Sequence, residues 1–280
     1  MKQLLVGLLL YFFHKISKKN IIRIWVKKVL GTSKIVINYE GIQLYAGTSS
    51  AIESNLIFDC YNEITVLRLI RDYAQKGYHF VDIGANIGIH SLTAARANSE
   101  IEIFSFEPES NNYRHFINNI SLNPFKNIRP LKLGLGNFNG ISELNINEGW
   151  NKGKHSLKLN FSTSTNKIKI PVTKLDTFFD LIEKKQVIIK IDVEGFEKEV
   201  IEGAKGFLQE IDNALLIIEL LPEINSFESC KEIVAMLKSF DFTTVYKIDS
   251  KNELVHVNDF EDSADYIFIK GGEAKASLTI

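Results

Sequence analysis

The segment from residue 80 to 91, FVDIGANIGIHS, constrains the fold most, because it joins a strand, a glycine turn and the start of a helix. His79 to Ile83 supplies apolar and β-branched strand residues, with Asp82 near the end. Gly84 and Gly88 let the backbone turn sharply and approach a ligand where a Cβ would intrude. We expect the helix to begin near Gly88, with its free amides facing the ligand. This order predicts a nucleotide-type ligand site.

The glycine spacing distinguishes between nucleotide ligands. A dinucleotide fold has the spacing G-x-G-x-x-G, whose third glycine serves a pyrophosphate. This chain has Gly84 and Gly88 with Asn86 between them, which matches that cradle poorly. A carboxylate at Asp82 would repel a phosphate, and it suits an amine or a hydroxyl, as on the methionine part of S-adenosylmethionine (SAM).

A second carboxylate follows the next expected strand. The run 101–106, IEIFSF, stops at Glu107 and Pro108. The tip of the second strand of a doubly wound sheet is where a ribose diol is held, since two hydroxyls match two acceptor oxygens. Taken singly, Asp82 could cap a helix and Glu107 could be a solvated loop residue. Their combination at this spacing favours a cofactor site.

A third strand end, KIDVEG at 190–195, concentrates charged side chains. Ligands of open α/β sheets bind beyond the carboxyl ends of the strands, and a bend at Gly195 would let Lys190, Asp192 and Glu194 converge there. A carboxylate in that crevice could take a proton from a hydroxyl. The alternative is that Lys190 pairs with Glu194 and that Asp192 caps the next helix.

The rest of the chain alternates strands and helices. Expected strands, beside a hairpin at 35–45 that turns at Glu40 and Gly41, are 79–83, 101–106, 129–135, 141–146, 168–172, 187–191, 214–220, 243–248 and 266–270. Expected helices are 63–74, those ending near 97 and 122, 175–183, 196–208 and 228–240. This order predicts an α/β fold with a doubly wound, mainly parallel sheet covered on both faces. The last two strands are expected to form an antiparallel hairpin at its edge.

Composition bounds the remaining possibilities. A chain of 280 residues with 45% hydrophobic content can form one α/β domain, expected at 61–280, plus an accessory segment of helices and hairpin at 1–60. Cys60 and Cys230 are the only cysteines, so neither a disulfide framework nor a cysteine-based zinc site is implied, and we expect a reducing, cytoplasmic location and no metal in the site. A net charge of −1 argues against a nucleic-acid partner.

The first 39 residues nevertheless contain eight lysines and arginines and no acid. The apolar run Leu4 to Phe13 is too short to span a bilayer, which needs about 20 residues. Apolar side chains there, and again from Ile21 to Val29, fall at helical spacing beside the basic ones. Such a helix can lie peripherally on an anionic membrane surface. It can equally pack on its own domain with its lysines in water.

The chain resembles the FkbM-type SAM-dependent methyltransferases over about residues 63–220. The matching motifs are VDIGANIG (81–88), FEP (106–108), VTKLD (172–176), IKIDVEGFE (189–197) and IEGA (201–204). The resemblance implies the class I methyltransferase (Rossmann-like) fold with its seven-stranded sheet, SAM as cofactor, and O-methylation of a small-molecule or glycan hydroxyl.

By position, the resemblance also implies residue roles. Glu107 would hold the ribose, and the turn at 134–136, with Leu135, would hold the adenine. An acidic or serine residue common after that third strand is replaced here by Leu135-Gly136-Asn137, which indicates a backbone contact. Asp82, Gly84, Asn86 and Gly88 would surround the amino-acid part of SAM, and Ala85 is also expected to bind the cofactor.

Methyl transfer needs an acceptor held in line and a base for its proton. Candidate bases are Asp192, Glu194 and His155, the last in a polar loop at 147–167, and Lys190 belongs to the same crevice. His90 is expected to be structural, and the remaining histidines, His115 among them, show no partner pattern. Two other readings stay open: an NAD(P)-dependent oxidoreductase, and a non-catalytic membrane-surface domain that keeps the fold.

Overall fold

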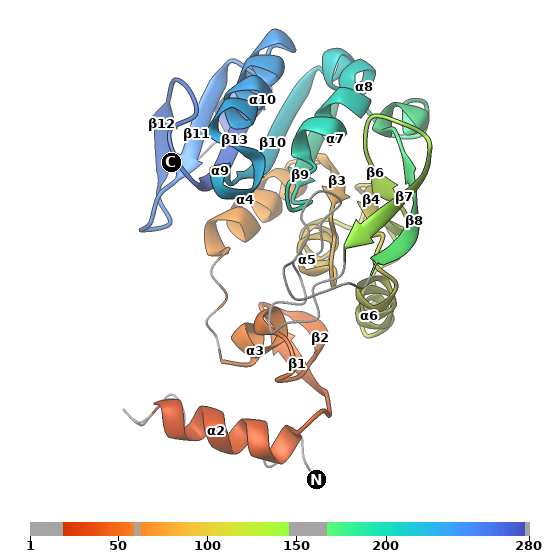
Figure 1. Ribbon diagram of the computed structural model, residues 1–280, viewed down its shortest axis with the longest axis vertical. Coiled ribbons are helices and arrows are strands. Elements are labelled where there is room, and N and C mark those ends of the chain that lie inside the picture. Colours follow the sequence, from red (N-terminus) through yellow and green to blue (C-terminus); the bar gives the residue numbers. More distant parts are fainter. Residues whose placement is uncertain (1–18, 59–60, 62, 146–166, 278–280) are drawn as a thin grey trace.

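The computed structural model describes residues 19–58, 61, 63–145 and 167–277 (Figure 1). Its central sheet has eight strands in the order β12-β11-β13-β10-β9-β3-β4-β5. These strands are β3 (His79–Ile83), β4 (Ile103–Phe106), β5 (Ile128–Leu131), β9 (Gln186–Ile191), β10 (Asn213–Leu220), β11 (Thr244–Ile248), β12 (Leu254–Val257) and β13 (Ala264–Lys270).

The strand directions confirm the expected mainly parallel sheet. From β5 through β4, β3 and β9 to β10 every neighbouring pair is parallel. β13 then pairs antiparallel with β10 and β11, and β11 pairs antiparallel with β12. The sheet therefore has eight strands rather than the seven expected. The additional strand is β12, which is only four residues long, and two of these are exposed.

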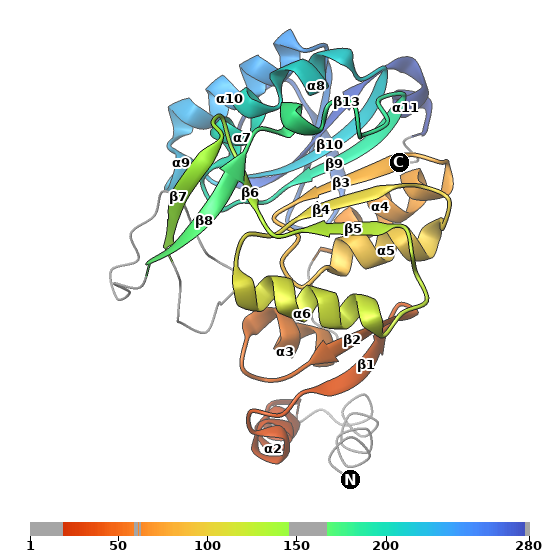
Figure 2. The same ribbon diagram turned by 90° about the vertical axis from the view of Figure 1, so that its right-hand side faces the viewer.

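Helices cover both faces of the sheet, as a doubly wound fold requires (Figure 2). One face packs against α4 and α5 through Phe80, Ile103 and Ile188. The opposite face packs against α7, α8 and α10 through residues such as Val81 and Ile189. The helices of this region are α4 (Ile64–Gln75), α5 (Ile89–Ala97), α6 (Ser110–Ser121), α7 (Glu197–Gly203), α8 (Lys205–Glu210), α9 (Pro222–Asn225), α10 (Phe227–Ser239) and α11 (Gly272–Ser277).

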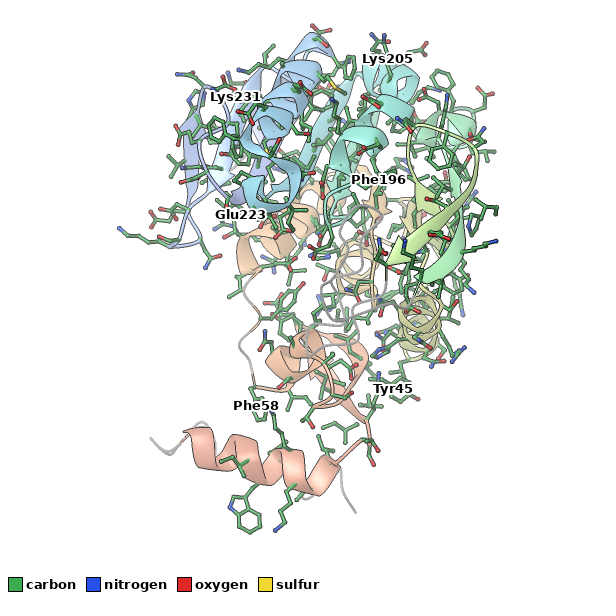
Figure 3. The ribbon with its side chains drawn as sticks, in the orientation of Figure 1. Tyr45, Phe58, Phe196, Lys205, Glu223 and Lys231 are labelled. Atoms are coloured by element: carbon green, nitrogen blue, oxygen red, sulfur yellow. The ribbon has the colours of Figure 1, made fainter. Side chains whose placement is uncertain are left out.

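The N-terminal region forms a separate layer, farthest from the sheet in Figure 1. It consists of α2 (Lys19–Leu30), the expected hairpin β1 (Ile35–Tyr39) and β2 (Ile42–Ala46), and α3 (Ala51–Ile57). Val26 and Leu30 of α2 are fully buried against this hairpin and Phe58, whose side chain points toward α2 in Figure 3. One face of α2 therefore packs on its own protein. The domain boundary expected after residue 60 stays a prediction.

Asparagine side chains join this layer to the sheet domain. The side-chain oxygen of Asn119 on α6 accepts from the Tyr45 amide at 2.8 Å, and its amide donates to the Ile87 carbonyl at 2.9 Å. Asn123 bonds both the amide and the carbonyl of Gln43, at 2.9 and 2.8 Å. These side chains form hydrogen bonds with backbone groups at the edge of β2, where no further strand pairs with it.

Three expected elements differ from the sequence prediction. The strand at 129–135 divides into β5 and β6 (Gly134–Leu135), and β6 joins a small sheet with β8 (Lys167–Thr173) and β7 (Gly140–Asn145). The helix expected at 175–183 is only a 3₁₀ turn, Leu175–Phe178. The helix at 196–208 breaks at Ala204, next to Gly203, where an added Cβ would lie 1.8 Å from the Gly136 carbonyl oxygen. The end of α7 thus packs closely on the backbone at Gly136, next to the point where the helix breaks.

No helix among the described residues is both long and apolar enough to cross a membrane. The run Leu4 to Phe13 and Cys60 lie outside the described residues. Cys230 is a buried free thiol on α10, and burial raises its pKa to about 11. Such a thiol is unreactive at neutral pH, in line with a structural role.

Candidate active site

A cavity of about 210 Å³ lies at the carboxyl ends of β3, β4, β9 and β10. The chain order reverses between β3 and β9, so the cavity occupies the switch point at which open α/β sheets bind ligands. One water needs only about 10–15 Å³, so the space suits a larger ligand. The residues around it are Ile52, Glu63, Ile83, Gly84, Asn86, Phe106, Glu107, Pro108, Asn112, Leu133, Gly134, Leu135, Leu144, Asp192, Val193, Glu194 and Glu219.

The two glycines of the β3–α5 turn serve a different purpose from the one expected. Both have left-handed backbones, with φ of 86°. A Cβ on Gly84 would lie 1.9 Å from the Asp192 carbonyl oxygen, and one on Gly88 would lie 2.0 Å from the Phe116 ring. A Cβ at either position would therefore collide with the protein itself, whether or not it would also meet a ligand. Gly84 lines the cavity, and Gly88 starts α5 behind it.

Glu107 lies in the cavity at the tip of β4, where the sequence placed the ribose carboxylate. One carboxylate oxygen accepts from the Asn86 amide and the other from the Glu109 amide, both at 2.8 Å. These two amides hold the side chain in place. Each oxygen can accept a second hydrogen bond, so the carboxylate can still bind two hydroxyls. Burial raises the pKa of Glu107 to about 8, despite those two amides.

Asp82 is not among the residues that line the cavity, and the role expected for it beside the cofactor stays a prediction. It is fully buried beneath the turn, and its Oδ2 accepts from the Ser91 hydroxyl at 2.5 Å. Ser91 is in turn 2.7 Å from the Ser105 hydroxyl, so this group ties α5 to β3 and β4. Burial raises the pKa of Asp82, which favours its neutral form. Any effect of Asp82 on a ligand acts through the turn.

The other expected cofactor residues divide in the same way. Asn86 lines the cavity with a left-handed backbone, φ 51°, which is strained for a residue with a side chain and typical of functional turns. Ala85 lies behind it, and its amide donates to the Phe106 carbonyl at 3.0 Å. The turn amides are thus used within the protein rather than free for a ligand. Leu135 lines the cavity beside Gly134, as the adenine assignment requires.

Asp192 and Glu194 both line the cavity at the end of β9. Lys190 is buried beside it, and its ammonium is 2.8 Å from Asp192 Oδ2. The alternative pairing of Lys190 with Glu194 is therefore wrong. Glu194 and Gly195 both have positive φ, 51° and 101°, which marks the expected bend after the strand. His155 lies outside the described residues.

Glu219, which the sequence gave no reason to select, completes a group of three carboxylates. It is the next-to-last residue of β10, and one oxygen each of Asp192, Glu194 and Glu219 lies within 4.8 Å of the others. Burial, with Asp192 and Glu194 nearby, raises the pKa of Glu219 to about 9. A neutral carboxyl beside charged ones lets the group share a proton. The signal available in the sequence was only its position at the end of a buried strand.

Glu63 and His90 form a second feature that the motifs did not show. Glu63 lines the cavity, and its Oε2 is 2.8 Å from His90 Nε2 on α5. Although burial opposes ionisation, His90 and Lys190 lower the pKa of Glu63 to about 2. His90 is thus structural, as expected, but it acts on a carboxylate that faces the ligand space.

The cavity fits a ligand with the chemical parts of SAM. Phe106, Pro108 and Leu133 give one end an apolar lining for a planar base. Glu107 follows with acceptors for a diol, and the carboxylates of Glu63 and Asp192 lie where a cationic sulfonium and ammonium would be stabilised. The lining therefore has the chemical features that a SAM site of a methyltransferase requires.

The family follows from the sequence as a whole. The Methyltransferase FkbM domain matches residues 82–244, more than half of the chain, and the chain belongs to this family. SAM is accordingly its cofactor, and methyl transfer is its reaction.

Individual proteins are also similar to this chain. The chain is 24% identical over 242 residues to the hexuronic acid methyltransferase AglP of Haloferax volcanii, covering 84% of this chain and 93% of that protein. It is 26% identical over 174 residues to Methyltransferase 1 of Beauveria bassiana, covering 55% of this chain and 69% of that one. Among solved structures, an FkbM methyltransferase from Methylobacillus flagellatus has a TM-score of 0.43 and 17% identity over 78% of this chain. This chain spans about half, 52%, of that structure.

Proposed function

We propose that the protein transfers the methyl group of SAM to a hydroxyl of a sugar or glycan. The observation that carries the proposal is the carboxylate group Asp192, Glu194 and Glu219 at the end of the cavity away from the apolar lining, where an acceptor hydroxyl can lose its proton. The relative AglP, named for a hexuronic acid, supports a sugar as acceptor.

In this mechanism the protein positions two ligands and removes one proton. Bound SAM supplies an electrophilic methyl group on its sulfonium. Glu107 would accept hydrogen bonds from the ribose hydroxyls, and the turn at Gly84 and Asn86 would limit where the methionine part can lie. The close approach of the Asp192 backbone to that turn fixes the distance between the cofactor and the acceptor carboxylates.

Asp192 is the side chain we assign as base, because Lys190 holds it in one orientation at 2.8 Å. The proton that leaves the acceptor hydroxyl goes to the Asp192 carboxylate, beside which Glu219 favours its protonated form. Glu194 extends the same group toward the acceptor. A site of this kind orients a hydroxyl and accepts its proton without moving any backbone.

The test is methyl transfer from isotopically labelled SAM to a set of sugars, with products identified by mass spectrometry. We expect labelled O-methyl sugar with the wild-type protein. Binding of NADH in place of SAM, or methyl transfer to nitrogen only, would contradict the proposal.

We also propose that α2 contacts an anionic membrane surface on the cytoplasmic side. Ile24 and Trp25 are 65% and 53% exposed although Val26 is buried, and Lys27 and Lys28 are exposed beside them. Aromatic and basic side chains on one helix suit a lipid interface. Trp25→Ser should reduce binding to vesicles containing phosphatidylserine but not SAM affinity. Equal binding to neutral and anionic vesicles would contradict the contact.

A further inference from the structure

The cavity adjoins two open sides of unlike charge. Through Glu219 it meets a hollow near β11 and β13 that Asp262 and Asp265 line. The lysine of that hollow, Lys247, is already paired with Glu261 and Asp262 at 2.7 and 2.9 Å. This side therefore repels an anionic ligand.

On the other side, two hollows continue along α6. The first shares Ile52, Asn86 and Asn112 with the cofactor cavity. The second shares Lys34 and His115 with the first, and no carboxylate lines it within the described part of the chain. We call these two hollows the α6 groove. The shared residues place the two hollows side by side along α6, next to the cofactor cavity.

One face of α6 forms a wall of the groove. Asn111, Arg114, Asn118 and Ser121 follow one another at intervals of three or four residues, so they lie on the same side of the helix. All four are exposed. Amide and hydroxyl groups both donate and accept hydrogen bonds, as the hydroxyls of a sugar do, so this polar stripe suits a glycan lying along the helix.

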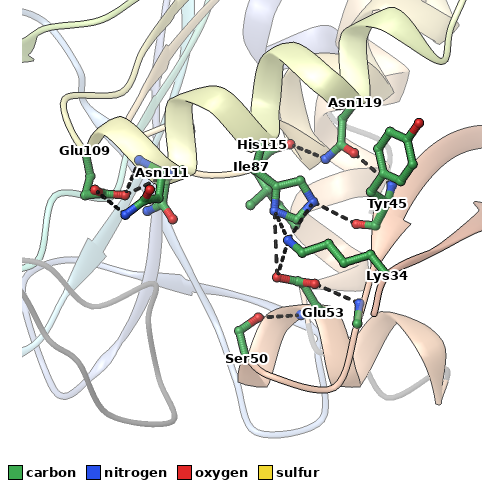
Figure 4. A network of polar contacts seen from close by, with 11 residues as sticks. Lys34, Tyr45, Ser50, Glu53, Ile87, Glu109, Asn111, His115 and Asn119 are labelled. Atoms are coloured by element: carbon green, nitrogen blue, oxygen red, sulfur yellow. Dashed lines mark hydrogen bonds and ion pairs between the residues drawn. The ribbon is translucent and has the colours of Figure 1, made fainter. Parts of the chain in front are cut away.

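The charge of the groove resides in Arg114. Figure 4 shows the Lys34 ammonium between Glu53 and His115, 2.9 Å from Glu53 Oε1 and 2.9 Å from His115 Nδ1. His115 Nε2 is 2.8 Å from the Tyr45 carbonyl oxygen, so Nε2 carries the hydrogen and Nδ1 accepts from Lys34. His115 is thus neutral, in keeping with a pKa that burial and Lys34 lower.

Glu53 therefore balances Lys34, and the guanidinium of Arg114 has no ion pair among the described residues. A guanidinium binds a carboxylate or a phosphate through two parallel hydrogen bonds. The groove thus combines a polar stripe for sugar rings with one unmatched cation.

We infer that the acceptor is an anionic glycan that lies in the α6 groove. Its carboxylate or phosphate binds Arg114, its hydroxyls contact Asn111 and Asn118, and the hydroxyl to be methylated reaches Asp192. This inference rests on the proposed function and adds the charge of the acceptor and the path by which it binds.

The test compares charged and neutral probes by calorimetry in the presence of S-adenosylhomocysteine. The probes are a hyaluronan tetrasaccharide, the same tetrasaccharide with its carboxyl groups reduced, and glucose 1-phosphate beside glucose. The proteins are wild type, Arg114→Gln, and the control Arg68→Gln, whose arginine is exposed on α4 and outside these hollows.

We expect the wild type and Arg68→Gln to bind one of the anionic probes about tenfold more tightly than its neutral counterpart. Arg114→Gln should remove that difference, and the preferred probe identifies carboxylate or phosphate as the anion. Equal binding of charged and neutral probes, or equal behaviour of the two variants, overturns the inference alone. Failure of every sugar to bind overturns the proposed function as well. Weaker SAM binding in Arg114→Gln assigns the groove to the cofactor and also overturns the inference.

Discussion

SAM binding should depend on pH through Glu107, and the structure gives the size of the effect. Burial raises the pKa of Glu107 to about 8 in the free protein. Ribose hydroxyls donate hydrogen bonds, so they favour the ionised carboxylate, and binding below pH 8 must release a proton. With only the ionised form competent to bind, affinity should rise about 25-fold between pH 6.5 and pH 8.5.

Calorimetry in buffers of different ionisation enthalpy measures both the affinity and the protons released. The wild type should release close to one proton per SAM at pH 7. Glu107→Gln cannot titrate, so its binding should release fewer protons, and any titration of the ligand's own amino group persists and can be subtracted. At pH 8.5 we expect Glu107→Ala to weaken binding by about 1.5–3 kcal/mol. Identical pH profiles for the wild type and Glu107→Gln would refute the reasoning.

The same pKa has a consequence for folding. The carboxyl of the unfolded chain has its ordinary pKa of about 4.5, whereas the folded one stays protonated until about pH 8. The stability that this difference contributes is complete below pH 4.5 and is lost as the pH rises through 8. Thermal denaturation without SAM should therefore show a smaller loss of stability between pH 5 and pH 8 in Glu107→Gln than in the wild type.

Three further predictions concern the acceptor carboxylates, the turn and the junction with the N-terminal layer. Asp192→Asn and Glu194→Gln should lower kcat by about 10²–10⁴ but change SAM affinity little, and equal losses in kinetics and calorimetry would contradict their placement. Gly84→Ala should lower the free energy of unfolding, measured by urea denaturation, by more than about 3 kcal/mol. The control Gly77→Ala, at a position with positive φ but open space around it, should lower it by about 1–2 kcal/mol. Equal losses would exclude a clash with the Asp192 carbonyl oxygen. Asn119→Ala, which removes two buried bonds, should cost about 2–4 kcal/mol in thermal unfolding.

Strand ends could be predicted from the sequence because each one combines two local signals. An apolar run that stops at a polar or glycine residue locates both a strand and the edge of the sheet where it ends. Glu107, Asp192 and Glu194 were found in this way, and all three line one cavity. Asp82 has the same pattern but is buried beneath the turn, where its carboxylate accepts from the Ser91 hydroxyl.

Glu63, His90 and Glu219 could not be predicted, because their role depends on which strands and helices become neighbours. Glu219 precedes the end of β10 and becomes part of the site only because β10 lies beside β9. His90 meets Glu63 only because α4 and α5 cover the same face of the sheet. His115 likewise lies beside Lys34 and Glu53, which are far from it in the sequence. Local sequence patterns do not indicate which distant residues become neighbours in the fold.

The two motifs VDIGANIG and IKIDVEG act as one structural unit. The Asp192 amide donates to the Ile83 carbonyl at 3.0 Å, and the Asp192 carbonyl occupies the space that a Cβ on Gly84 would need. The backbone that limits the cofactor and the backbone that carries the acceptor carboxylate are thus in direct contact. Any side chain at residue 84 would push both apart, so it should lower kcat through misplacement as well as through stability. Gly84 is therefore required because it lets the two backbone segments come close together, and this sets the distance between the cofactor and the acceptor.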